Sequence, residues 1–266
     1  MSPSPDSSGA PEEPWDPPRP RRGPGWTLPL LLLLAAGGWG AWWWLTHRGE
    51  PVAPAAVADA GEPDAGVVEP PLQESDPQVR NQLAGLSADP LWTSWLEQVD
   101  LVRRFAAAVQ QVADGDSPRA SVPFLAPSAA FAVREPKRGP VTIDPKSYAR
   151  YDAVAKAFAS LDAQKAAAAY RALQPLLDRA WRELGPPGTR FEGALARAVA
   201  RLVEVPVPKG EVEVVSRGAL WAFKDEALEQ RSAAEKHLLR MGPENMQRVQ
   251  VKLRELQGTL GLPEKP

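Results

Sequence analysis

The sequence predicts a mainly α-helical protein, with a single transmembrane helix plus a multi-helix soluble domain that contains at most a small β-hairpin or short strands. Three observations predict this fold class. An uncharged apolar stretch occupies residues 26–45. Beyond residue 75, apolar side chains recur with the spacing of one helix face. Between these stripes, Pro, Gly and Asp stand where helices usually begin and end.

The 266 residues divide by composition into four parts. Residues 1–25 are rich in Pro, Ser and Gly and predict a disordered cytoplasmic tail, and residues 26–45 predict the transmembrane helix. Residues 46–74 predict a disordered linker rich in Pro and Ala, in which positions 50–74 hold six acids and no base. Residues 75–262 predict the helical soluble domain, which is long enough to bury its own core.

The stretch Trp26–Leu45 is long enough to cross a bilayer, because its 20 residues span about 30 Å as a helix. Tryptophans lie at both of its ends, as in an interfacial aromatic belt. Three arginines precede the stretch and only Arg48 closely follows it, so the N-terminus is expected in the cytoplasm and the domain in the periplasm. A cleaved signal peptide is the alternative, but its apolar region is shorter and ends near small residues.

The first helices of the soluble domain are predicted from their start signals and apolar stripes. Asp76-Pro77 and Asp89-Pro90 each open a helix, because proline is favoured in the first turn. A third helix is expected from about Val99 to Ala113, and Gly115 ends it.

Five further helices follow, and their expected ranges are 145–161, 163–184, 191–203, 233–241 and 243–260. Pro175 lies inside the second of them and predicts a kink. Ser232 and Glu235 have the spacing of a capping box. Gly242 is expected to take the left-handed conformation that ends the 233–241 helix.

Two segments predict short β structure. Residues 116–143 break the helical pattern and suggest a hairpin with strands Phe131–Arg134 and Val141–Ile143. Apolar and polar residues alternate in Glu211–Val215, which predicts another short strand.

Four segments carry a resemblance to a known family: Asp100–Phe105, Ile143–Asp152, His237–Asn245 and the helix Arg248–Leu256. With the order of anchor and acidic linker, they resemble the bacterial envelope family called domain of unknown function 3014. The resemblance extends over most of residues 70–257. It implies a layout and a bacterial source, and it implies no activity and no catalytic residue.

The sequence does not predict an enzyme. The absence of cysteine excludes thiol nucleophiles and cysteine metal sites. Of the two histidines, His47 adjoins the predicted membrane helix and His237 lies in a predicted amphipathic helix, where we interpret it as a packing residue. No glycine-rich nucleotide loop occurs. We therefore expect no cofactor and no metal, and the modest positive charge of the soluble domain does not indicate nucleic acid as a partner.

Carboxylate chemistry is the alternative that composition leaves open, because two acids can meet from distant positions. The densest acidic group consists of Asp225, Glu226 and Glu229, which we interpret as a solvated helix start. Tyr148, Arg150 and Tyr151 combine aromatic and cationic groups, but the tyrosine spacing faces the core, so we interpret them as packing residues.

A candidate binding surface surrounds the corner between the last two helices and consists of Arg240, Glu244, Asn245, Arg248 and Lys252. Glu244 and Asn245 equally suit a structural role at a helix N-terminus. Arg248 and Lys252 form a basic pair one turn apart, on an expected solvated face. If the surface is functional, it suits an anionic partner such as lipid head groups or wall polymers.

The function that these observations favour is a membrane-tethered interaction or scaffold domain in the bacterial envelope. Its expected partner is an envelope protein or an anionic envelope polymer. A carboxylate-dependent envelope hydrolase is the alternative. Two carboxylates within about 5–10 Å at the base of a deep groove would favour the hydrolase, and a flat or shallow apolar patch would favour binding.

Overall fold

The computed structural model describes residues 71–264. The predicted tail, the predicted transmembrane helix Trp26–Leu45 and nearly all of the predicted linker therefore lie outside the described residues. Within residues 71–264, no helix has both the length and the apolar character needed to cross a bilayer. The described residues belong to one unit, Val67–Pro266.

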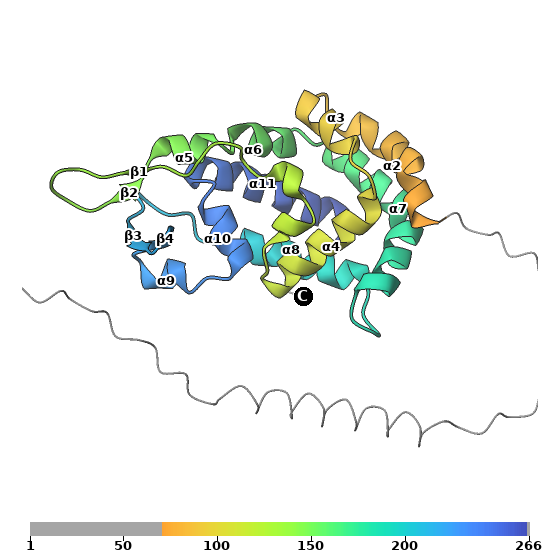
Figure 1. The fold of residues 1–266 in the computed structure, drawn as a ribbon. Helices are drawn as coiled ribbons and strands as arrows, with labels where there is room; N and C mark the ends of the chain where they lie inside the picture. Colours follow the sequence, from red (N-terminus) through yellow and green to blue (C-terminus); the bar gives the residue numbers. More distant parts are fainter. Residues whose placement is uncertain (1–70, 265–266) are drawn as a thin grey trace, which may run out of the picture. The chain divides into compact units, whose positions relative to one another are not determined.

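Ten α-helices form most of the described part, which confirms the mainly α-helical fold class (Figure 1). They are α2 (Asp76–Leu83), α3 (Pro90–Leu96), α4 (Leu101–Asp114), α5 (Pro145–Ala149), α6 (Asp152–Ala159), α7 (Ala163–Leu184), α8 (Phe191–Val203), α9 (Glu226–Glu229), α10 (Ala233–Leu239) and α11 (Pro243–Leu260). Four 3₁₀ helices connect some of them: η1 (Leu72–Ser75), η2 (Ala84–Leu86), η3 (Pro118–Ala120) and η4 (Pro123–Leu125).

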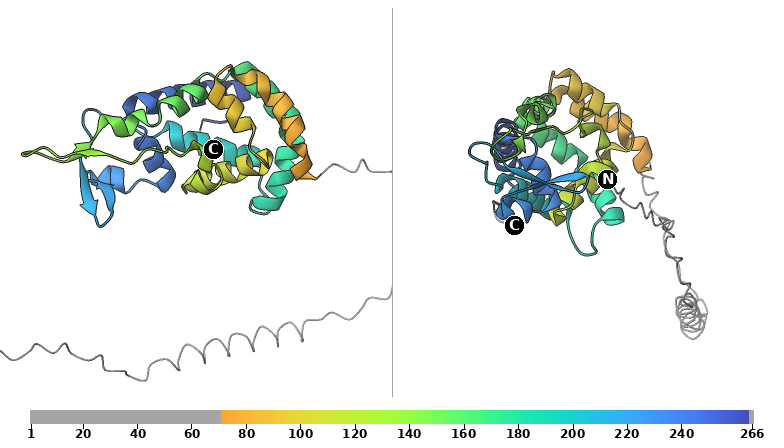
Figure 2. Two further views of the ribbon diagram at one scale, coloured as in Figure 1. Left: turned by 45° about the horizontal axis from the view of Figure 1, so that its top comes forward. Right: turned by 60° about the vertical axis from the view of Figure 1, so that its left-hand side comes forward.

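Two antiparallel hairpins complete the fold. Strand β1 (Val133–Arg134) pairs with β2 (Thr142–Ile143), which confirms the predicted hairpin with shorter strands. Strand β3 (Val214–Arg217) pairs with β4 (Leu220–Phe223), and β4 was not predicted. Gly218, with φ 63°, makes the tight turn between them. Both hairpins lie at the same end of the domain, away from α2 and α7 (Figures 1 and 2).

Aromatic packing marks the main core, where α4, α7, α8 and α11 meet. Phe191 is 1% exposed, and its ring centroid lies 5.7 Å from that of Trp181 and 6.5 Å from that of Tyr170. Leu72 of η1 is equally buried and belongs to the same core. The packed structure therefore begins at η1, before the boundary that the sequence predicts at residue 75. A second core lies around Met246 of α11, beneath the hairpins.

Several helices begin at the predicted positions, where a side chain caps the N-terminus. The side chains of Asp89, Asp144 and Asp162 accept hydrogen bonds from backbone amides in the first turns of α3, α5 and α7. Ser232 and Glu235 form the predicted capping box at the start of α10. Helix α7 continues without interruption through Pro175.

The start of α4 differs from the prediction because Asp76 holds it from a distance. The Asp76 carboxylate accepts hydrogen bonds from the amides of Asp100 and Leu101, at 2.7 and 2.9 Å. These amides are among the donors that a helix leaves without an internal partner. Asp100 accordingly takes φ 60°, and α4 begins at Leu101. Val99 therefore lies outside the helix, and it is 64% exposed.

The predicted helix 145–161 is two helices, because Arg150 and Tyr151 separate α5 from α6. The Tyr148 carbonyl accepts hydrogen bonds from Tyr151 N at 2.9 Å and from Asn245 Nδ2 at 3.2 Å. A side chain of α11 thus engages a carbonyl at the break. Helix α6 then packs along α11.

Gly242 has φ 82° and ψ 163° and precedes α11 as its N-cap residue. The prediction of a left-handed helical conformation was wrong in ψ. The observed region of φ and ψ is open essentially to glycine alone.

Candidate functional site

The five residues of the predicted binding surface do not form one surface. Asn245 is 2% exposed and cannot meet a partner from solution. Its amide nitrogen lies 2.8 Å from Asp152 Oδ1, 3.2 Å from the Tyr148 carbonyl and 3.1 Å from the Met241 carbonyl. Asn245 therefore fastens α11 to the junction of α5 and α6.

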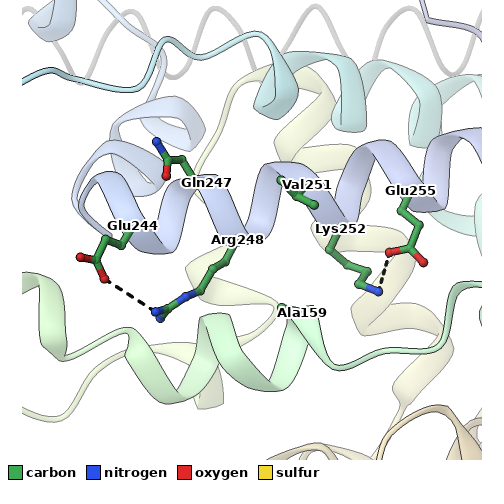
Figure 3. Close-up of a pocket in the computed structure, with 7 residues that line it drawn as sticks. All are labelled: Ala159, Glu244, Gln247, Arg248, Val251, Lys252 and Glu255. Atoms are coloured by element: carbon green, nitrogen blue, oxygen red, sulfur yellow. Dashed lines mark ion pairs between the residues drawn. The ribbon is translucent and has the colours of Figure 1, made fainter.

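Glu244, Arg248 and Lys252 line a groove of about 520 Å³ between α11 and α6 (Figure 3). Arg248 lies 3.6 Å from Glu244, and Lys252 lies 2.7 Å from Glu255. Lys252 Nζ also donates a 2.6 Å hydrogen bond to the Leu161 carbonyl, and its side chain is 11% exposed. The expectation of a solvated basic pair was wrong for Lys252, which ties α11 to the segment after α6.

Arg240 lies apart from this groove. Its guanidinium donates to the Trp221 carbonyl at 3.1 Å and lies 5.4 Å from the centroid of the Phe223 ring. Both contacts are with β4. The structure thus brings Glu244, Arg248 and Lys252 together, buries Asn245 and uses Arg240 to hold the second hairpin.

No two free carboxylates meet in this groove. Glu244 and Glu255 both line it, but they are separated by about 16 Å along α11 and each pairs with a cation. Among the other acids, Asp225 caps α9 through Ala227 N, which confirms its interpretation as a helix start. Glu229 is partly exposed, but it accepts a hydrogen bond from Phe223 N and pairs with Lys236, so its carboxylate links α9 to β4 and α10.

A second concavity lies inside the helical part of the domain, and we call it the apolar cavity. Its volume is about 480 Å³, which is within the range of small-molecule sites. Its walls come from α3, α4, α6, α8, α10, α11 and the segment between α4 and β1. Most of the lining is apolar and includes Trp95, Val112, Leu125, Val154, Phe158, Met241 and Val249.

Several of these apolar side chains are only partly buried, although they belong to the packed part of the fold. Val112, Val154, Phe158 and Met241 are all of intermediate exposure. Apolar area left in contact with water forgoes about 25 cal/mol per Å². An apolar occupant of the cavity would recover that free energy, so the lining favours a ligand that is itself apolar.

One wall of the cavity is irregular, and we call it the proline segment (residues 116–131). Pro118, Pro123 and Pro127 interrupt regular structure along it. The segment is held by the Ser121 hydroxyl, which donates to Gln111 at 2.9 Å, and by the Ala129 carbonyl, which accepts from Arg150 at 2.8 Å.

His237 joins the proline segment to α10. Its Nε2 atom lies 2.7 Å from the Ser117 hydroxyl, within hydrogen-bond distance. Burial lowers the pKa of His237, and the charges of Arg240 and Arg119 lower it further. The imidazole is therefore neutral at pH 7, and its role is that of a half-buried packing residue, as predicted.

Two arginines line the apolar cavity and differ in their contacts. Arg150 donates to the Ser147 and Ala129 carbonyls and stacks on Phe131 and Tyr151. Arg119 is exposed, and among residues 71–264 its guanidinium has no hydrogen-bond or ion-pair partner. None of the residues that line the cavity is acidic.

The sequence missed this cavity because its residues lack a common pattern. Val154 and Phe158 lie within the predicted helix 145–161, Arg119 belongs to no motif, and Arg150 and Tyr151 are interpreted from the sequence as packing residues. The nearest available signal was the apolar content of the proline segment, which has no periodicity.

The fold and the cavity define a mainly helical domain with an apolar concavity of ligand size. Within residues 71–264, no group of three or more His, Asp and Glu side chains could hold a metal ion.

A model of the family described as protein of unknown function (DUF3014) matches residues 101–257, which is more than half of the chain, and the chain belongs to that family. The family membership that the sequence indicated is thereby confirmed over residues 101–257, whereas the envelope location and the bacterial source stay predictions. The matched region contains every residue that lines the apolar cavity except Trp95. No curated protein and no solved structure matches the chain.

Proposed function

We propose that the chain is a membrane-tethered binding module of the bacterial envelope, and that its domain takes an apolar ligand into the apolar cavity. The observation that carries the proposal is the cavity lining, which is mostly apolar, partly exposed and large enough for a small molecule. The tether and the periplasmic location rest on the predicted helix Trp26–Leu45 and the arginines that precede it.

The same lining weighs against the hydrolase alternative. General acid–base chemistry by carboxylates needs two acids that reach the bound substrate. The apolar cavity has no acidic lining residue, and the acids of the groove beside α6 are engaged in ion pairs. The engagement of Lys252 and the burial of Asn245 likewise reduce the support for an anionic polymer bound at that groove.

Photo-crosslinking tests the proposal in the full chain within native membranes. The probe is an alkyl diazirine without a charged head group, and the adducts are located by peptide mass spectrometry. We expect adducts to concentrate on peptides that contain Val154, Phe158 and Met241. Adducts spread over the exposed surface, with no enrichment on these peptides, would contradict the proposal.

A matched pair of variants sharpens the test. Val154→Trp adds bulk inside the apolar cavity, whereas Val251→Trp adds the same bulk at a position on α11 that is 62% exposed and does not line the cavity. We expect the first variant to lose the enriched adducts and the second to retain them. The smaller change Val154→Met provides a second filling variant if Val154→Trp unfolds the domain.

A further inference from the structure

Resting on the proposed function, we infer that the ligand of the apolar cavity is a single-chain acyl carboxylate whose head group binds Arg119. The inference starts from the composition of the lining. Apolar side chains dominate it, so a small hydrophilic anion would lose its hydration without replacement. An alkyl chain is the kind of group that such walls accept.

Charge at the cavity is of one sign. The lining contains Arg119 and Arg150 and no acid. The pKa of His237 is lowered by burial and by Arg240 and Arg119, which indicates a positive field on the α10 side of the cavity. A ligand with a cationic head group would meet repulsion from that field, and an anionic head group would meet attraction.

Arg119 is the residue that remains able to bind the anion. Arg150 already donates to two backbone carbonyls and lies over two aromatic rings. The Arg119 guanidinium has no partner within residues 71–264, and its side chain is exposed at the edge of the cavity. The planar fork of a guanidinium matches the two oxygens of a carboxylate.

Hydrogen bonds fix the backbone of Arg119 within the wall of the cavity. Arg119 belongs to η3 within the proline segment, and Ser117 caps that turn by accepting from Arg119 N. The Ser117 hydroxyl is also the one within 2.7 Å of His237. Ser117 thus connects the backbone of Arg119 to His237 of α10, while the Arg119 guanidinium makes no hydrogen bond or ion pair within residues 71–264. The chain of the ligand would lie among Val154, Phe158 and Met241.

Competition against the alkyl diazirine probe tests the head group in the full chain within membranes. The competitors are a medium-chain fatty acid, the alcohol of the same length and the alkyl phosphate of the same length. We expect the fatty acid to suppress the enriched adducts at a concentration at least about tenfold lower than the alcohol, as a charge-assisted hydrogen bond would give.

Two arginine variants identify the residue responsible. Arg119→Gln should remove the advantage of the fatty acid over the alcohol. Arg138→Gln removes the same charge from an exposed residue of the β1–β2 loop and should leave the advantage intact. If Arg119→Gln unfolds the domain, Arg119→Lys supplies the second variant and should weaken the advantage, because lysine lacks the fork.

Each outcome has one meaning. Equal suppression by acid and alcohol overturns the inference and leaves the proposed function standing. Stronger suppression by the alkyl phosphate overturns the assignment of a carboxylate. An advantage that persists in Arg119→Gln overturns the role of Arg119. Absence of enriched cavity adducts without any competitor contradicts the proposed function itself.

Discussion

The ring of Tyr148 lies on the backbone of Gly242, so closely that a Cβ atom at residue 242 would be 2.4 Å from Cγ of the tyrosine. Burial of this ring, with a smaller contribution from Glu211, raises the pKa of Tyr148 to about 12. The contact joins α5 to the corner between α10 and α11. Glycine is required there twice, once by the positive φ of 82° and once by the ring.

We expect Gly242→Ala to lower the free energy of unfolding by about 2 kcal/mol or more, through backbone strain and overlap with Tyr148. Gly258→Ala is the control, because a Cβ atom there meets nothing within 4 Å and the residue lies inside α11. That substitution should stabilise the domain by roughly 0.5–1 kcal/mol. Urea denaturation of residues 67–266 measures the free energy of unfolding of both variants. Similar values for the two would contradict the requirement for glycine at position 242.

Asn245→Ala should destabilise the domain by roughly 2–3 kcal/mol, because it removes the hydrogen bonds to Asp152, Tyr148 and Met241 in a buried place. Glu244→Ala, at the neighbouring position with a side chain 87% exposed, should change the stability by less than about 0.5 kcal/mol. Thermal unfolding monitored by circular dichroism distinguishes them. If Asn245→Ala left the stability unchanged, the hydrogen bonds of Asn245 would not contribute to holding α11 against α5 and α6.

The elements that sequence analysis predicted well are those whose signals are local. Asp144 and Ser232 each cap a helix within three residues of themselves, so the signal and its structure share one short segment. The break at Arg150 and the start of α4 at Leu101 depend on Asn245 and Asp76, which come from distant parts of the chain. No local pattern could have shown those two contacts.

The candidate site was predicted less well than the fold, for the same reason. Arg248 and Lys252 have the spacing of an exposed pair, and nothing in the sequence shows that the Leu161 carbonyl takes up Lys252. The apolar cavity is built from segments as distant as Trp95 and Leu253. A stripe such as Val154 and Phe158 looks alike in sequence whether it fills a core or lines a cavity.

Lys252→Glu should lower the free energy of unfolding by about 2 kcal/mol, since it leaves the Leu161 carbonyl without its donor and sets a carboxylate beside Glu255. Lys137→Glu, an equal charge change on the exposed β1–β2 loop, should remain within about 0.5 kcal/mol of the parent. Chemical denaturation of the two variants side by side is the measurement. Equal and small changes in the free energy of unfolding would support the interpretation of Lys252 as part of a solvated basic pair.

His237 predicts a pH dependence of stability. Its pKa lies below the ordinary value of 6.5 in the folded chain, because of burial and the charges of Arg240 and Arg119. Below pH 6.5 the unfolded chain binds a proton that the folded chain does not, so stability falls as the pH drops, and it levels off below the folded pKa. His237 is the only histidine of residues 67–266.

The measurement is the free energy of unfolding of the parent and of His237→Gln, between about pH 7.5 and pH 5. Glutamine can retain a hydrogen bond to Ser117 but does not titrate. As the pH decreases, the free energy of unfolding of the parent should therefore fall relative to that of His237→Gln. A constant difference over this range would show that His237 has an unperturbed pKa.

The membrane topology depends on residues that precede the domain. A reporter active only in the periplasm should be active when fused after Pro266 and inactive when fused before Trp26, because three arginines stand on the N-terminal side of the apolar stretch.

Replacement of Arg19, Arg21 and Arg22 by glutamine removes that asymmetry and leaves Arg48 as the nearest cation. The fraction of chains with an active C-terminal reporter should therefore decrease. Replacement of the three acids Glu62, Asp64 and Glu69 in the linker is the matched control, and it should leave the reporter unchanged since acids contribute little to orientation. Activity of the N-terminal fusion alone would place the domain in the cytoplasm and would remove the periplasm from the proposed function, while the cavity and its Arg119 test would stand unaltered.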